Sequence, residues 1–262
     1  MKRLMFSLAT LSTLFVWAGS GEENSYRKVD NGAFKRGESL KFRIHYGTIN
    51  AGEAVVVIDQ SNKPIHGRST LHAVGKGYSL GAFDWFFKVR DHYETYMDEA
   101  ALIPWIFVRN VDEGGFKINQ NQIYDHKNGK VLSNGKSVVV PKNIQDMLSS
   151  FYFARTIDFS KAKVGDVFSI PTFVDDEIWE LKMRYIGTET IKSQVGRVNC
   201  LKFRPIVQKG RVFKKEEDMT VWISNDQAKV PVRAEADILV GSIKMDLVGY
   251  SGLTAPLNIQ KK

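Results

Sequence analysis

The chain has 262 residues, and its 37 lysines and arginines exceed its 29 aspartates and glutamates, which gives a formal net charge of +8. Basic residues are spread along the chain and no zinc-finger or RNA-binding signature is present, so nucleic-acid binding is not expected. The positive excess favours anionic partners such as lipid headgroups or acidic glycans. A single cysteine, Cys200, excludes an internal disulfide and is expected to be a buried apolar side chain.

The first twenty residues have the pattern of a cleavable secretory signal peptide. The basic pair Lys2-Arg3 precedes the apolar run Leu4–Trp17, and the small residues Ala18-Gly19-Ser20 predict cleavage after Ser20. The run is shorter than the roughly 20 apolar residues of a membrane-spanning helix. A buried N-terminal helix is the alternative. No cysteine follows the cut, so we expect a periplasmic or secreted protein without a lipid anchor.

After residue 37 the dominant pattern has a period of two. In Leu40–Tyr46 and Trp179–Tyr185 apolar and polar side chains alternate, which places one face of a strand on a core and the other in water. Further strands are predicted at Glu53–Asp59, Arg68–Gly75, Val89–Met97, Trp105–Val111, Phe116–Tyr124, Lys130–Val139, Val167–Val174, Val198–Val207, Asp218–Ser224, Val232–Val240 and Ile243–Val248.

The order of these segments predicts an all-β, mainly antiparallel fold. No alternation of strands with helices is visible, so either a barrel-like fold or two packed sheets is expected. We predict a single β domain over residues 38–250. A disordered linker at residues 21–37 precedes it, and a C-terminal tail at residues 251–262 follows.

The last predicted hairpin carries a conflict in its register. The sequence Val240-Gly241-Ser242-Ile243 fits a two-residue turn with glycine first. That turn would set Asp237 opposite Asp246, and two like charges in this position destabilise a sheet. Two solutions stay open: a longer loop, or relief of the repulsion by Lys244.

Two helices are expected to interrupt the strands. Ile144–Arg155 has apolar residues at i, i+3, i+4 and i+7 spacing, and Asn143 followed by Asp146 resembles an N-cap with an acid at N3. Tyr78–Phe87 is a shorter, aromatic-rich candidate that Gly81 weakens. We therefore predict one amphipathic helix and one short aromatic helix.

No motif in the chain indicates a particular chemistry. No two histidines have metal-ligand spacing among His45, His66, His72, His92 and His126. No serine-nucleophile motif or glycine-rich phosphate loop is present, and Gly75, Gly77 and Gly81 are expected in a flexible loop. The acidic run Asp175-Asp176-Glu177 is expected in a turn, with cation binding as the less favoured alternative. We expect no catalytic residue, no metal and no cofactor.

Aromatic side chains gather in one short segment. Phe83, Trp85, Phe86 and Phe87 lie within five positions and cannot easily all face one core. One interpretation is a helix that plugs one end of a barrel with its aromatic rings inside. The other is a surface that faces a ligand, a membrane or a partner.

Charged residues accompany the aromatic segment in the following strands. Asp91, His92, Glu94 and Glu113 form a possible polar cluster. Arg109 and Asp91 could lie on neighbouring strands of one hairpin. In that arrangement Arg109 could pair with the Asp91 carboxylate and orient a ligand. A surface ion pair of little energetic consequence is the favoured alternative.

Several segments together resemble one family. Phe83–Asp91, Tyr93-Glu94-Thr95, Gln145–Arg155, Val221–Asp226 and Pro231-Val232-Arg233 are similar to the exported bacterial family known as domain of unknown function 3108. The resemblance covers most of the predicted β domain. It implies a secreted, all-β, barrel-like fold similar to that of an outer-membrane capsule-related lipoprotein, the YmcC-like fold, and implies no catalytic residues. This chain differs from that lipoprotein in lacking a lipidation cysteine.

The preferred function is non-catalytic binding by an exported cell-envelope protein. A glycan, lipid or peptide would lie in a β-walled cleft, with Trp85, Phe86, Phe87 and Tyr93 as anchors and Arg109 as the charged group. An envelope-directed hydrolase that uses the polar cluster is one alternative. A structural partner of an outer-membrane or periplasmic protein complex is the other.

Overall fold

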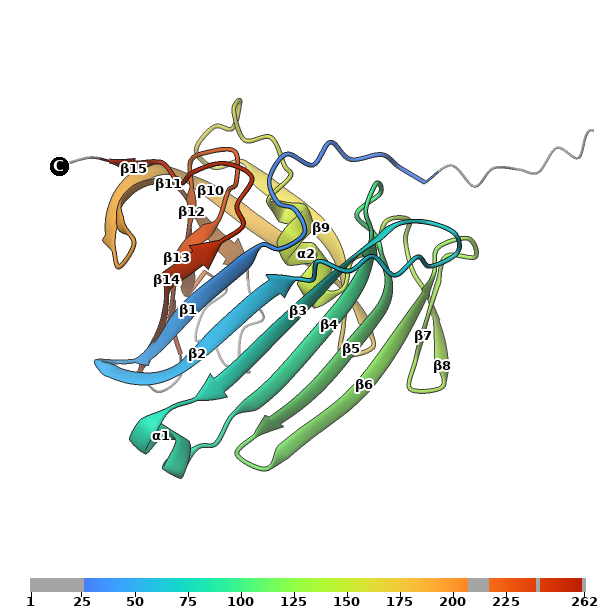
Figure 1. Cartoon of the computed structure of the whole chain (residues 1–262), viewed down its shortest axis with the longest axis horizontal. Helices are drawn as coiled ribbons and strands as arrows, with labels where there is room; N and C mark the ends of the chain where they lie inside the picture. The colour runs from blue at the N-terminus through green and yellow to red at the C-terminus, as the bar shows by residue number, and fades with distance from the viewer. Residues whose placement is uncertain (1–25, 207–216, 239–240, 261–262) are drawn as a thin grey trace, which may run out of the picture.

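The computed structural model describes residues 26–206, 217–238 and 241–260, so the predicted signal peptide lies outside the described residues (Figure 1). The helices are α1 (Gly81–Phe86) and α2 (Met147–Ala154). The strands are β1 (Ser39–Tyr46), β2 (Ile49–Ile58), β3 (Thr70–Ser79), β4 (Arg90–Asp98), β5 (Pro104–Glu113), β6 (Phe116–Asp125), β7 (Lys130–Ser133), β8 (Lys136–Val139), β9 (Val167–Val174), β10 (Glu177–Ser193), β11 (Gly196–Ile206), β12 (Met219–Ser224), β13 (Pro231–Asp237), β14 (Ser242–Ser251) and β15 (Ile259–Gln260).

The strands form one large antiparallel sheet, which confirms the predicted fold class. Their spatial order is β8-β7-β6-β5-β4-β3-β2-β1-β14-β13-β12-β11-β10-β9, and β15 pairs with β11. Sequence neighbours pair throughout except where β1 joins β14. Among the described residues no ladder joins β8 to β9, so the sheet does not close. None of the described helices is long and apolar enough to cross a membrane.

Two-residue periodicity gives the sheet an apolar inner face and a polar outer face. On β1, Leu40 and Phe42 are buried in a core cluster, and Phe42 lies opposite Leu247 of β14. The next residue, Arg43, lies opposite Asp246 on the outer face. The prediction of a strand at Leu40–Tyr46 is confirmed, because alternate side chains of a strand point to opposite faces.

The sheet curls so that its two ends approach each other around α2 (Figure 1). The turn between β9 and β10 consists of Asp175 and Asp176, both with left-handed φ values of 51° and 63°. Arg109 Nη1 of β5 donates to Asp175 Oδ1 (2.7 Å), and Gln120 Nε2 of β6 donates to Asp176 Oδ1 (2.9 Å). The expected acidic turn is therefore present. Its carboxylates accept hydrogen bonds from protein side chains, and no metal-binding group of three or more His, Cys, Asp or Glu residues occurs in the described ranges.

Helix α2 begins three residues later than predicted. Asp146, which we expected at N3, is the N-cap, and its Oδ1 accepts from the backbone N–H groups of Leu148 (2.7 Å) and Ser149 (2.6 Å). Its other oxygen accepts from the Thr95 hydroxyl of β4. Asp146 is completely buried, so these donors are the ones that satisfy its carboxyl group. The expected cap Asn143 instead has a left-handed φ of 61° before the helix.

The other end of α2 is fixed by a buried ion pair. The Arg155 side chain is 1% exposed and forms a two-point contact with Glu38, with N–O distances of 2.6 and 2.8 Å. The same guanidinium donates to the carbonyl oxygens of Ala228 (2.9 and 3.0 Å) and Ala33 (3.2 Å). These bonds satisfy a charge in the centre of the molecule and join α2 to segments more than 70 residues away.

Both segments predicted to flank the domain pack against it. The expected disordered linker is wrong for residues 26–37, because Ala33 and Phe34 are buried in the main core cluster. The C-terminal segment likewise buries Leu257 and adds β15 to the sheet, so it is not a free tail. Both segments are rich in polar residues, but burial of these few apolar side chains stabilises the packed conformation.

The last hairpin avoids its predicted conflict through a different register. Asp237 pairs with Ser242, and Asp246 lies opposite Arg233, not Asp237. Arg233 Nε donates to Asp246 Oδ1 at 2.6 Å. The predicted turn at Gly241-Ser242 was therefore wrong. The Ile238 N–H donates to the Gly241 carbonyl oxygen (3.2 Å), and this register exchanges a repulsive cross-strand pair for an attractive one.

Candidate ligand-binding groove

An apolar groove lies between the inner face of β1–β4 and helix α2. Its volume is about 340 Å³, at the small end of the range for small-molecule sites. The sheet side is lined by Ile44, Ala54, Val56, Gly75, Lys76, Gly77, Asp91 and Tyr93, and the helix side by Met147, Leu148 and Phe151. Most of these side chains are aliphatic or aromatic, so the groove suits an apolar ligand.

Small residues on two strands create the space in the groove. Gly75 and Gly77 occupy inward positions of β3, and Ala54 does so on β2. A Cβ atom added at Gly75 would lie 3.8 Å from a methyl carbon of Leu148, and one at Gly77 would lie 3.7 Å from Asp91 Cβ. The prediction of a flexible loop at Gly75 and Gly77 was therefore wrong. These glycines belong to a strand and leave its inner face without side chains.

Polar groups stand at one end of this apolar wall. Asp91, Tyr93, Arg109 and Glu113 occupy alternate positions of β4 and β5 and share one face of the sheet. Burial, followed by repulsion from Glu113, raises the pKa of Asp91 to about 6. Burial also raises the pKa of the Tyr93 hydroxyl. A weakly acidic carboxyl group thus lies beside apolar surface.

Arg109 does not form the ion pair that the sequence suggested. It lies opposite Tyr93 in the β4–β5 ladder, and its hydrogen bond goes to Asp175 in the β9–β10 turn. The expected hairpin between β4 and β5 is present, but the partner from β9–β10 could not be inferred from local sequence. Arg109 therefore joins the two ends of the sheet and is not among the residues that line the groove.

The remaining members of the predicted polar cluster face the other way. His92 Nε2 lies 2.6 Å from Glu94 Oε1, and His72 Nε2 lies 2.8 Å from Glu94 Oε2. His72 also stacks on Tyr96, with ring centroids 4.1 Å apart. Adjacent residues of a strand point to opposite faces, so Asp91 is separated from this group by the sheet. The acid–base set expected for a hydrolase is divided between the two faces.

The aromatic segment forms α1 at one end of the sheet. Trp85 and Phe86 are 84% and 77% exposed, and no residue of α1 is buried. The interpretation as a barrel plug was therefore wrong. The helix is also shorter than predicted, because Tyr78 and Ser79 still pair in β3. The predicted anchors Trp85, Phe86 and Phe87 do not line the groove, whereas Tyr93 does.

A second hollow lies at the base of α1. It has a volume of about 610 Å³ and shares Lys76, Gly77 and Asp91 with the groove. It then extends to Asp84 and Arg90 at the base of α1. Its lining also includes Tyr78 and His92, which occupy outward positions of β3 and β4, so this hollow lies largely on the outer face of the sheet.

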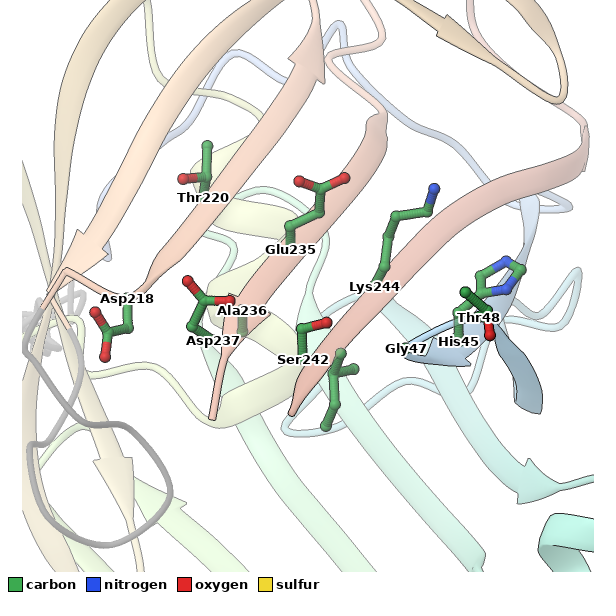
Figure 2. Close-up of a pocket in the computed structure, with 11 residues that line it drawn as sticks. His45, Gly47, Thr48, Asp218, Thr220, Glu235, Ala236, Asp237, Ser242 and Lys244 are labelled. Atoms are coloured by element: carbon green, nitrogen blue, oxygen red, sulfur yellow. The ribbon is translucent and has the colours of Figure 1, made fainter. Parts of the chain in front are cut away.

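A third hollow lies on the outer face, where β12, β13, β14 and β1 run side by side (Figure 2). Figure 2 shows Glu235 and Lys244 projecting from neighbouring strands, with His45 beside them on β1. Lys244 contacts Asp246 at 3.1 Å and Glu235 contacts Arg233 at 3.7 Å, so charged side chains here have partners within the protein. This polar hollow offers little apolar surface to a ligand.

The groove residues were largely missed by sequence reasoning. Ile44, Val56, Leu148 and Phe151 look like ordinary core residues in the sequence, because only the missing side chains of the facing glycines leave them accessible. The one available signal was the pair Gly75 and Gly77 at alternate positions next to a strand pattern.

Comparison with solved structures found one of similar architecture with a TM-score above 0.5. A crystal structure described as a beta-barrel-like protein of domain of unknown function DUF1849 from Brucella abortus has a TM-score of 0.55 and 10% identity, and the match covers 84% of this chain and 99% of that chain. A Bacteroides fragilis protein described as exported and YmcC-like in fold has a TM-score of 0.34 and 12% identity, with 86% and 100% covered. A comparison with curated proteins found no match.

The first of these structures shows the fold alone. The family model described as protein of unknown function (DUF3108) matches residues 41–248, which is most of the chain. This match covers every strand of the groove. The chain therefore belongs to the DUF3108 family, as its sequence resemblance predicted.

Proposed function

We propose that the protein binds the apolar chain of an amphipathic molecule, such as a lipid, in the groove between β1–β4 and α2, and does so in the bacterial cell envelope. The observation that carries this proposal is the combination of an accessible apolar wall with a polar rim. Ile44, Val56 and Phe151 offer apolar contacts, while Asp91 and Tyr93 supply polar atoms at one end. The N-terminal leader pattern supports export.

The walls of the groove favour a lipid over the other two ligand classes that the sequence suggested. A glycan needs many hydrogen-bonding partners, and most groove side chains have none to offer. A peptide that adds to a sheet needs an unpaired strand edge. Strands β1, β2, β3 and β4 are each paired on both sides, so they provide no such edge. An acyl chain needs only apolar surface and space.

A matched pair of variants on β2 tests this function. Ala54 lines the groove, whereas its neighbour Val55 lies on the opposite face of the same strand. Ala54→Leu should fill the groove and weaken binding of a fluorescent fatty acid by about tenfold or more, because the displaced chain loses apolar contacts. Val55→Leu should leave binding unchanged. Fluorescence titration of the purified protein measures both.

A second groove variant tests whether misfolding, and not filling of the groove, causes weaker binding of the fatty acid. Gly77→Leu adds a side chain on β3, so it should weaken binding as Ala54→Leu does while the circular dichroism spectrum stays native. The proposal fails if the wild-type protein binds no fatty acid, or if Val55→Leu weakens binding as much as the two groove variants do.

A further inference from the structure

Exposed apolar side chains gather at one end of the sheet. We name this set the aromatic tip, and it consists of Ile49, Trp85, Phe86, Phe87 and Phe116. Their exposed fractions are 56%, 84%, 77%, 45% and 60% respectively. They come from the start of β2, from α1 and from the start of β6, whose ends lie together at the lower left of the molecule in Figure 1. Large exposed apolar groups concentrated in this way mark an interaction surface.

The tip has a defined shape. The Gly114 N–H in the β5–β6 turn donates to the Lys88 carbonyl oxygen just after α1 (2.8 Å). The Phe87 ring lies directly over Gly114, whose φ of +59° and missing side chain make room for it. The rings of Trp85 and Phe86 meet edge to face at 5.0 Å. The aromatic surface of α1 is therefore continuous with that of the β5–β6 turn.

An ion pair fixes the base of α1. Arg90 Nη1 donates to Asp84 Oδ1 at 2.6 Å, and the Ser79 hydroxyl also donates to this carboxylate. The Ser79 oxygen in turn accepts from the Val89 N–H (2.8 Å). These bonds join both ends of the α1 segment to β3 and β4. The exposure of Trp85 and Phe86 is thus built into the fold.

The charges at the tip discriminate between possible occupants. Lys88 directly follows Phe87 and Lys117 directly follows Phe116, and both lysines are exposed, with Lys117 also 3.4 Å from Asp112. Protein interfaces are depleted in lysine. Aromatic rings beside lysines are instead typical of segments that lie in the headgroup region of a bilayer. The chain carries a formal net charge of +8, or +6 after the predicted cleavage removes Lys2 and Arg3, and this excess adds attraction to anionic headgroups.

We propose that the aromatic tip is a docking surface for an anionic lipid bilayer. The rings of Trp85, Phe86 and Phe116 insert among the headgroups, and Lys88 and Lys117 contact phosphate oxygens. The inference goes beyond the proposed function and stands without it.

Co-sedimentation with vesicles tests the proposal. The wild-type mature protein should bind vesicles of phosphatidylglycerol and phosphatidylethanolamine and bind phosphatidylcholine vesicles more weakly. The double variant Trp85→Ser/Phe86→Ser should partition at least about tenfold more weakly, because two large apolar groups no longer leave water. Val139→Ser/Val164→Ser removes two apolar groups of 72% exposure elsewhere and should bind as the wild type does.

Fluorescence quenching adds a positional readout. Brominated phosphatidylglycerol quenches only tryptophans that reach the bilayer. Trp105 and Trp222 are buried, and the half-buried Trp179 lies on β10, which contributes no residue to the tip. The wild-type protein should be quenched, whereas Trp85→Phe should sediment with vesicles yet lose most of the quenching. This variant separates contact at Trp85 from a general effect of lipid on the protein.

Three results would overturn the proposal. One is failure of the wild type to bind anionic vesicles, and another is equal loss of binding in the tip variant and the control variant. The third is a dimer, seen by light scattering, that Trp85→Ser/Phe86→Ser abolishes, because a second copy of the chain would then occupy the tip. Ala54→Leu should keep full vesicle binding, so failure of the groove and failure of the tip can be distinguished.

Discussion

The two helices in the described part of the chain show opposite uses of aromatic and charged residues. Helix α2 lies inside the curled sheet, and buried charges at Asp146 and Arg155 hold its ends. Helix α1 lies at the sheet end, where an accessible pair of Asp84 and Arg90 holds it and its aromatic rings face outward. The comparison shows that polar contacts decide where each helix sits. Aromatic content alone does not indicate which helix is buried.

The largest effect is expected from removal of the charge that anchors α2. Arg155→Met would leave Glu38 buried without a partner and should lower the free energy of unfolding by about 3–5 kcal/mol. Urea denaturation measures this change. Arg155→Met/Glu38→Leu should recover much of the loss, because the orphaned charge is then gone. If Arg155→Met alone unfolds at the wild-type urea concentration, the pair does not anchor α2.

A smaller loss is expected at the other end of α2. Asp146→Ala removes the acceptor for two backbone N–H groups and the Thr95 hydroxyl, and should cost about 2 kcal/mol. Asp146→Asn keeps an acceptor oxygen and should cost less. Thermal unfolding of both variants at pH 7 measures the difference. Equal losses in the two variants would argue against the capping role.

Asp91 should make stability depend on pH. Its pKa of about 6 in the folded protein exceeds the ordinary value of 3.8, so the fold favours the protonated form. Its contribution is complete below pH 3.8 and is lost as the pH rises from there through 6. Because the group is half-buried and screened by solvent, Asp91→Asn should gain only about 1 kcal/mol over the wild type at pH 7, and nothing at about pH 3. Urea denaturation at both pH values checks this, and an equal gain at both would contradict it.

The smallest effect on stability is expected at the aromatic tip. Trp85 and Phe86 make few buried contacts, so Trp85→Ser/Phe86→Ser should have the melting temperature of the wild type within experimental error. Differential scanning calorimetry without lipid measures this. A clear drop would mean that the rings of α1 stabilise the fold after all, as a plug would.

Patterns in the sequence predicted the sheet but not the way it curls. The alternation in Leu40–Tyr46 and Trp179–Tyr185 needs only local information, and both strands are present. The cap of α2 was misplaced because burial of Asp146, a tertiary effect, decides between it and Asn143. The partner of Arg109 lies 66 residues away in a turn, and nothing near Arg109 specifies it.

The candidate site was only partly predictable for the same reason. Tyr93, Arg109, Asp91 and Glu113 do lie together, since two-residue periodicity along paired strands places them on one face. The groove itself depends on space between β3 and α2, and the sequence distance between Gly75 and Leu148 hides that contact. Sequence patterns predict which residues share one face of a strand or helix. They do not predict which of these faces pack against each other.

The seam between the two ends of the sheet has a consequence for the dynamics of the protein. Arg109, Gln120 and Ser133 reach the β9–β10 turn through side-chain hydrogen bonds, and no described backbone ladder crosses from β8 to β9. Opening the seam therefore breaks a few side-chain hydrogen bonds and the packing of Phe173 of β9 against Tyr124 of β6, but leaves every strand pairing intact. Amide hydrogens in the strand ladders should therefore exchange slowly with solvent. The interior near α2 should still become accessible to solvent transiently, whenever the two ends of the sheet separate.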